Sequence, residues 1–174
     1  MTPYPTATEM TPELIVPGSS MARVAAAAAE AGLAIRILKM EQSTRTAQEA
    51  ADAVGCDVAQ IVKSLVFENS ATGKLDLMLV SGAHNADMDY ISEAYKLNFA
   101  RCDGRRVRDE TGFAIGGVAP IGHLKPIAVY MDRTLLKRAV VWAAAGRPDS
   151  VFSVDPTALA SAIGADIIDV RAAG

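Results

Sequence analysis

The sequence predicts an α/β or α+β domain, and three observations lead to that fold class. The chain has 174 residues, a length that suits one compact domain with a single sizeable core. Apolar residues make up 51% of it but aromatic residues only 5%, so small aliphatic side chains must fill that core. Helix-type and strand-type patterns are mixed along the chain, which does not suit a β-sandwich. We expect residues 1–17 to form a flexible arm and residues 18–174 to form one domain.

Helices are expected where a capping residue precedes an apolar pattern with helical spacing. Ser19 or Ser20 caps the first helix, which Gly32 stops. Thr46 and Glu49 form the capping box of a second helix. The remaining expected helices are a short one after Asp57, one opened by Asp87, an exposed one over 105–110, a turn over 135–138 and a last one from Asp155 and Pro156 through Ile163.

Strands are expected at short apolar runs bounded by turn-forming residues. The clearest pair covers residues 64–68 and 75–80, which the turn-rich residues 69–74 join as a hairpin. Residues 111–126 contain four glycines and two prolines, so we expect them to be mostly loop. The other expected strands cover residues 33–40, 127–131, 139–145, 151–154 and 167–170.

Charge and composition disfavour several classes of function. A formal net charge of −3 gives no overall field to attract a polyanion, so non-specific duplex binding is disfavoured, and a DNA-binding role lacks a helix-turn-helix signature. Residues 1–17 do not combine a basic start with an apolar stretch, and no segment has the length of a membrane span. We therefore expect a cytoplasmic protein without membrane contact.

No sequence motif predicts a metal or an organic cofactor. The motifs HExxH, GxSxG and the Walker loop are absent from the sequence. Cys56 and Cys102 are far apart, which favours two free thiols over a disulfide or a thiolate metal site. His84 and His123 cannot form a metal site alone, so we expect neither metal nor cofactor.

Two segments remain as candidates for chemistry. Lys63 lies in QIVKSLVF (residues 60–67), where a short helix passes into an apolar strand. Taken alone, it is typical of a lysine at a helix end with its amine in water. Residues 112–123 read GFAIGGVAPIGH, and paired glycines followed by proline let a substrate approach main-chain N–H groups closely. Taken alone, this segment is typical of a structural turn.

Together and in this order, the two segments resemble the family of prolyl-tRNA-synthetase-associated editing domains, also called the YbaK type. The resemblance extends over residues 21–170. It includes RTAQEAADAVG at residues 45–55, QIVKSLVF at 60–67, GGVAPIG at 116–122 and the late Ala145 and Gly146.

The resemblance implies a mixed, curled, partly barrel-like sheet surrounded by helices. It also implies hydrolysis of the ester that joins an amino acid to the terminal adenosine of a tRNA. In such a site Lys63 would contact the terminal nucleotide and meet the glycine-rich loop, whose N–H groups would stabilise the oxyanion. The implied catalytic residues are Lys63, Gly116, Gly117 and Val118, and the implied substrate-binding residues are Ala119, Pro120, His123, Ala145 and Gly146.

The function that we expect is a trans-acting aminoacyl-tRNA deacylase that acts on tRNA-Pro carrying a small non-cognate amino acid. The expected partners are the aminoacylated 3′ end of the tRNA and prolyl-tRNA synthetase. The alternative is a non-catalytic module of the same fold that binds a nucleotide, a tRNA or a synthetase. The family's cysteine-clearing enzymes tend to have Ser-Gly-Gly where this chain has Ala144-Ala145-Gly146, so alanine, serine, threonine, cysteine and small non-protein amino acids all stay open.

Three further positions each have two interpretations. His123 either lines the pocket or is a partly exposed loop residue, and for His84, at an expected strand end, a substrate role is the less favoured interpretation. The basic cluster over residues 101–108 either contacts the acceptor stem of the tRNA or forms a solvated helix face.

Overall fold

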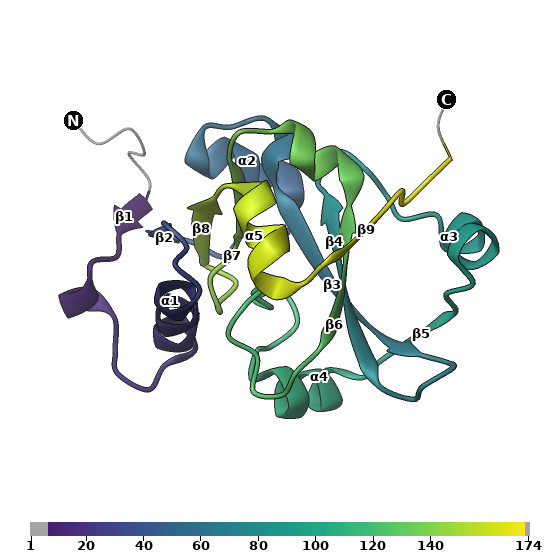
Figure 1. The fold of residues 1–174 in the computed structure, drawn as a ribbon. Coiled ribbons are helices and arrows are strands. Elements are labelled where there is room, and N and C mark those ends of the chain that lie inside the picture. The colour runs from purple at the N-terminus through teal and green to yellow at the C-terminus, as the bar shows by residue number, and fades with distance from the viewer. Residues whose placement is uncertain (1–6, 173–174) are drawn as a thin grey trace.

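The computed structural model describes residues 7–172 and contains two β-sheets with helices packed around them (Figure 1). In the first sheet all neighbouring strands are antiparallel. Its strands, in spatial order, are β1 (Ala7–Glu9), β2 (Arg36–Met40), β8 (Ser150–Val154) and β7 (Val141–Ala144). The second sheet is mixed, because β4 pairs antiparallel with β3 and parallel with β6. Its order is β5 (Phe99–Arg101), β3 (Val62–Asn69), β4 (Leu75–Ser81), β6 (Ala128–Asp132) and β9 (Asp166–Ile168).

The two sheets meet where β3 begins. A parallel bridge joins Ile61, just before β3, to Trp142 of β7. At its other end β3 pairs with β5. The strands therefore form one curled, partly barrel-like layer that is not a closed barrel, as expected for the fold class.

Helices cover both sides of this layer. The main core lies on its inner side and contains Val24 of α1 (Ser20–Glu30), Val107 of α4 (Gly104–Thr111) and Leu159 of α5 (Pro156–Ile163). On the outer side, α2 (Ala47–Val54) packs on the first sheet around Trp142, and α3 (Met88–Tyr95) packs on the second sheet around Val80. Three short 3-10 helices complete the fold: η1 (Pro12–Leu14), η2 (Val58–Gln60) and η3 (Arg133–Lys137).

The predicted helix starts are confirmed by their capping hydrogen bonds. The Ser19 hydroxyl accepts from the N–H of Ala22 at 3.2 Å. The Thr46 hydroxyl accepts from the N–H of Glu49 at 3.1 Å, and α5 begins at the expected Pro156 after the Asp155 cap. These signals are local, because the side chain and the main-chain groups that it caps are within three residues of each other.

Some boundaries differ from the prediction. Residues 7–9 form β1, which pairs with β2, so the expected flexible arm is wrong for these residues; residues 1–6 lie outside the described part. Strand β5 was not expected. The other strands are shorter or shifted: residues 33–40 give Arg36–Met40, residues 139–145 give Val141–Ala144, and residues 167–170 give Asp166–Ile168.

Candidate functional site

Lys63 lies on the outer face of the curled layer. Alternation along β3 places Val62 and Val66 in the main core and Leu65 against the α3 side, so Lys63 shares the outer face with Leu65. An isolated parallel bridge pairs Ile61, two residues before Lys63, with Trp142 of β7, two residues before Ala144. The lysine therefore stands at the seam between the two sheets, close to where they join.

The ammonium of Lys63 points to the loop that follows β4. It donates a hydrogen bond to the main-chain oxygen of His84 and another to Oδ1 of Asn85, at 3.5 Å. Burial lowers the pKa of the Lys63 ammonium, and the charge of Asp132 offsets part of that shift. Within residues 7–172 no carboxylate forms an ion pair with Lys63. Its positive charge is therefore only partly compensated.

His84, which sequence reasoning left with only a minor role, is held by a buried carboxylate. Its Nδ1 lies 3.1 Å from Oδ2 of Asp132, a residue that is only 1% exposed. The carboxylate also accepts from the N–H of Ser81 at 3.0 Å and from the hydroxyl of Thr134 at 2.8 Å. An Nδ1–H donor to the carboxylate leaves Nε2 as an acceptor. The arrangement thus fixes both the ring and its tautomer.

Hydrogen bonds keep Asp132 ionised despite its burial. Burial by itself raises the pKa of this carboxyl, but the hydrogen bonds from Thr134, Ser81 and His84 outweigh it and bring the pKa below its ordinary value. No local signal in the sequence joins these residues, since 48 positions separate His84 from Asp132.

The glycine-rich loop is shaped by its packing. Gly116 has φ 94°, a conformation that favours glycine. The N–H of Gly117 donates to the oxygen of Ala114 at 2.9 Å, so it is turned into the loop. The N–H groups of Gly116 and Val118 donate to no main-chain oxygen of residues 7–172. Of the three donors implied by the resemblance, that of Gly117 is already engaged, whereas those of Gly116 and Val118 have no main-chain acceptor in this part of the chain.

The His123 side chain forms a hydrogen bond within the glycine-rich loop. Its Nε2 lies 2.6 Å from the oxygen of Ala119, and its ring meets the ring of Phe113 edge-on at 5.3 Å. Burial lowers the pKa of His123, and the hydrogen bond to Ala119 opposes that shift. A neutral ring that donates from Nε2 fits these contacts. Its Nδ1 is buried without a partner in residues 7–172.

Helix α1 and the turn after β7 hold the other side of this loop. Arg23 donates to the oxygen of Gly112 at 2.5 Å and lies over the Phe113 ring at 4.9 Å. The oxygen of Gly146 accepts from the Ser20 hydroxyl at 2.8 Å. The implied residues Val118, Ala119 and Ala145 all belong to the main core, and Pro120 and Gly146 are buried as well.

The structure therefore places the implied site residues in two groups. The first is the glycine loop with the turn at Ala145 and Gly146, where Gly117 faces the main chain of Arg147. The second is Lys63 with the loop that contains His84. No hydrogen bond joins the Lys63 ammonium to residues 116–120 in the described chain, so the expected meeting of the two groups is not seen directly. Strand β7 lies between them, because its Trp142 bridges to Ile61 near Lys63 and Gly146 follows the end of the strand by two residues.

The basic cluster over residues 101–108 is partly neutralised. Arg106 forms ion pairs with Glu68 and Glu110, both at 2.6 Å, and donates to the oxygen of Gly73 at 2.7 Å. Arg101, Arg105 and Arg108 are exposed. This cluster holds the β3–β4 turn against α4, which is a structural use of its central arginine.

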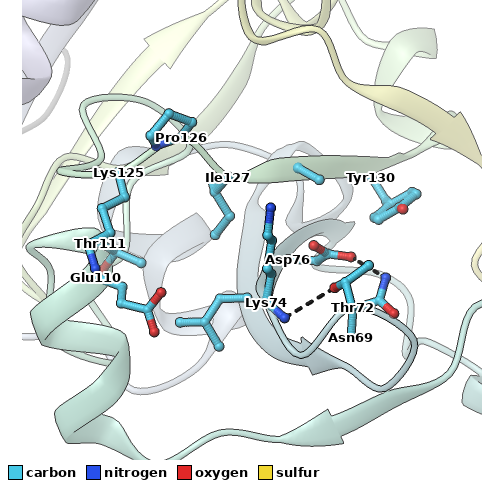
Figure 2. A pocket seen from close by; sticks show the side chains of 12 residues that line it. Asn69, Thr72, Lys74, Asp76, Glu110, Thr111, Lys125, Pro126, Ile127 and Tyr130 are labelled. Atoms are coloured by element: carbon cyan, nitrogen blue, oxygen red, sulfur yellow. Dashed lines mark hydrogen bonds between the residues drawn. The ribbon is translucent and has the colours of Figure 1, made fainter.

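An open pocket of about 740 Å³ lies at the far end of the hairpin (Figure 2). It contains a buried contact in which Asn69 donates to Asp76 at 2.8 Å. Asn69 is six residues from Lys63 along β3, which corresponds to about 20 Å. None of the implied site residues lines this pocket. This pocket is therefore distant from the residues that the sequence singled out.

Residues 7–172 contain neither a cluster of metal-ligating side chains nor a membrane-spanning helix. Three or more histidine, cysteine or acidic residues do not gather anywhere in this part of the chain in a way that could hold a metal ion. None of its helices combines the length and the apolar character needed to cross a membrane.

Comparisons with known proteins agree with this fold. Residues 41–162 match the family model described as the aminoacyl-tRNA editing domain. The protein YwhH of Bacillus subtilis (strain 168) is 27% identical over 123 residues, which are 71% of this chain and 78% of that protein. A solved structure of a "putative trans-editing enzyme for prolyl tRNA synthetase" is 39% identical with a TM-score of 0.80, covering 91% of this chain and 99% of the other. The structure of hypothetical protein APE2540 is 30% identical with a TM-score of 0.76, covering 85% and 98%.

Proposed function

The chain belongs to the aminoacyl-tRNA editing domain family, and on that premise we propose that it is a trans-acting deacylase of mischarged tRNA. The substrate is the ester between a small non-cognate amino acid and the terminal adenosine, with tRNA-Pro as the carrier and prolyl-tRNA synthetase as a partner. The name of the 39% identical neighbour favours this choice of synthetase. The cytoplasm, where tRNA charging takes place, remains the predicted location.

One observation supports the proposal most strongly. The ammonium of Lys63 is half-buried, and its hydrogen bonds go to a carbonyl and an amide oxygen rather than to a carboxylate. Such a cation is available to an incoming phosphate, and a phosphate oxygen would be a stronger acceptor than either neutral oxygen. In a chain of net charge −3 this is a specific feature, not part of a general positive surface.

The chemistry requires little from the protein. Water attacks the ester carbonyl, the bond between the acyl carbon and the ribose oxygen breaks, and that oxygen takes up a proton. The main-chain N–H groups of Gly116 and Val118 stabilise the oxyanion in this proposal, and one such donor is worth on the order of 3 kcal/mol. A neighbouring ribose hydroxyl orients the water, so no strong base is needed.

In this proposal Ala144, Ala145 and Gly146, at the end of β7, form the wall of the amino-acid pocket and select which amino acid is removed. Ala143 and Ala145 are fully buried, whereas Ala144 is partly exposed on the same face as Lys63. A methyl group there offers no hydrogen bond to a polar side chain. An apolar wall selects mainly by size, with about 1–3 kcal/mol for each methylene. We propose alanine as the preferred small amino acid.

A panel of charged tRNA-Pro species tests the proposal. The purified protein is incubated with tRNA-Pro that carries alanine, serine, cysteine, threonine or proline, and release of the amino acid is followed against the uncatalysed rate. Fast release of alanine with proline spared is the expected outcome. A Lys63→Ala preparation, purified in the same way, controls for contaminating hydrolases. Tight tRNA binding without release of any amino acid would overturn the enzyme and favour the non-catalytic module.

A further inference from the structure

Two open pockets meet at His84, on the side of the molecule formed by η3 and the end of β9. Their volumes are about 390 and 330 Å³. Both are lined by His84, Thr134 and Lys137, so the histidine forms the ridge between them. Each volume lies within the range of small-ligand sites. The ridge itself is rigid, because the buried Asp132 holds the ring.

Four cationic side chains line the two pockets beside this ridge, against the two carboxylates Asp132 and Asp169. Lys137 and Arg138 are exposed, and Arg171 lines the first pocket. Within residues 7–172 none of these three side chains forms an ion pair with a carboxylate. Arg133 differs from them, because Asp169 neutralises it at 3.0 Å. Together with Lys63, whose ammonium contacts the His84 main chain, these cations form a local positive patch on a protein of negative net charge.

The same surface also carries aromatic side chains next to the cations. Tyr90 lines the first pocket together with His84, and Tyr95 supports it edge-on at 6.5 Å. Unpaired bases stack on aromatic rings while their phosphates contact lysine and arginine, and single-stranded RNA is recognised in this way. A duplex does not expose base faces, so the combination favours an unpaired strand.

We propose that this surface, which comprises His84, Tyr90, Lys137, Arg138 and Arg171, binds the unpaired nucleotides that precede the terminal adenosine of tRNA. One base stacks on Tyr90 or His84, and the phosphates contact the three cations. The Lys63 ammonium donates to the main chain of His84, so a strand that crosses the ridge reaches that lysine next. This inference rests on the proposed function and adds the path by which the RNA enters.

The test compares two pairs of exposed cations in the same protein. The affinity for uncharged tRNA-Pro is measured over a range of salt concentrations for Lys137→Gln/Arg138→Gln. The matched control is Lys74→Gln/Lys125→Gln, which removes the same charge from exposed side chains at the far pocket. We expect the first variant to lose about tenfold in affinity at low salt and its salt slope to fall by about 1.4, for two phosphate contacts at about 0.7 each. The control should keep both values close to wild type.

Shortened RNA identifies the part of the tRNA that is bound. The loss in the Lys137→Gln/Arg138→Gln variant should disappear for tRNA-Pro that lacks its unpaired 3′ nucleotides. Tyr90→Leu, which keeps the apolar packing, should weaken binding of the intact tRNA about fivefold or more through lost stacking. Equal losses in both double variants, or a loss that persists without the 3′ nucleotides, would overturn the proposal.

Deacylation assays separate this inference from the function on which it rests. If wild-type protein releases alanine from charged tRNA-Pro and the Lys137→Gln/Arg138→Gln variant does so with unchanged KM, the entry path is wrong and the function stands. If wild-type protein releases no amino acid, the proposed function fails, whatever the binding data show.

Discussion

The glycine-rich loop and the Lys63–His84 end of the molecule are built in different ways. The loop is defined by main-chain shape, since Arg23 holds the oxygen of Gly112 and the N–H of Gly117 is turned inward. The other end is defined by side-chain charge, since Asp132 holds His84 and Lys63 keeps an ammonium that no carboxylate neutralises among the described residues. The glycine-rich loop should therefore lose stability when a larger side chain replaces a glycine. The Lys63–His84 end should lose stability or activity when a charged side chain is removed.

The largest expected effect is at the charged end. Asp132→Ala leaves the N–H of Ser81 and the Thr134 hydroxyl without their acceptor and releases His84. Breaking a buried charged contact of this kind costs about 3 kcal/mol or more of the free energy of unfolding. Chemical denaturation measures it. Asp132→Asn, which loses the charge but keeps an acceptor oxygen, should lose clearly less; losses equal to those of Asp132→Ala would show that the retained acceptor contributes nothing.

The next effect tests the shape of the loop. A Cβ at Gly117 would lie 2.9 Å from Cα of Arg147, and main chain cannot move as easily as a side chain. Gly117→Ala should therefore cost about 1–3 kcal/mol of stability through overpacking. The control is Gly104→Ala, where the nearest atom lies at 3.5 Å. Thermal unfolding of both variants gives the comparison, and an unchanged melting temperature for Gly117→Ala would contradict the tight packing.

Lys63→Ala separates function from stability. We expect at least a tenfold loss of deacylation, about 1.4 kcal/mol in transition-state energy. The unfolding free energy should stay within about 0.5 kcal/mol of wild type, because the ammonium is only half-buried and forms no ion pair with a carboxylate of residues 7–172. Lys74→Ala, at the far pocket, is the matched control. Normal turnover by the Lys63 variant would remove this lysine from the mechanism.

The smallest effect is the pH dependence of the loop. Burial lowers the pKa of His123 below its ordinary value near 6.5, so the unfolded chain takes up this proton before the folded chain does. Stability should be complete above pH 6.5 and fall as the pH drops from there towards the lowered pKa, by less than about 1.4 kcal/mol per pH unit. His123→Gln should flatten that part of the profile. Thermal unfolding between pH 5 and 7.5 measures it, and identical slopes would show that His123 titrates as a free histidine.

Local signals account for most of the fold that could be predicted. Ser19, Thr46 and Asp155 cap helices through neighbours within three residues, so their patterns are visible in the chain. Strands β1 and β5 were missed because each is three residues long and exists only through pairing with a distant strand. The preference of three residues for an extended shape is too weak to predict them.

The residues of the candidate site likewise fall into those that the sequence could predict and those that depend on distant contacts. Lys63 and Gly116 were found because their sequence context resembles a family. The partner of His84 was not, since Asp132 follows it by 48 positions and each residue alone is unremarkable in a sequence. The inward turn of the Gly117 N–H was equally invisible, because main-chain direction depends on packing against Arg147.

The bridge between Ile61 and Trp142 joins the two sheets at a seam, where a bound RNA could restrict their relative motion. Lys63 belongs to one sheet, while Ala145 and Gly146 follow the last strand of the other. An RNA end that contacts residues of both sheets would hold the two sheets together at that seam. Amide protons on either side, at residues 61 and 142, should then exchange more slowly with solvent once the tRNA is in place.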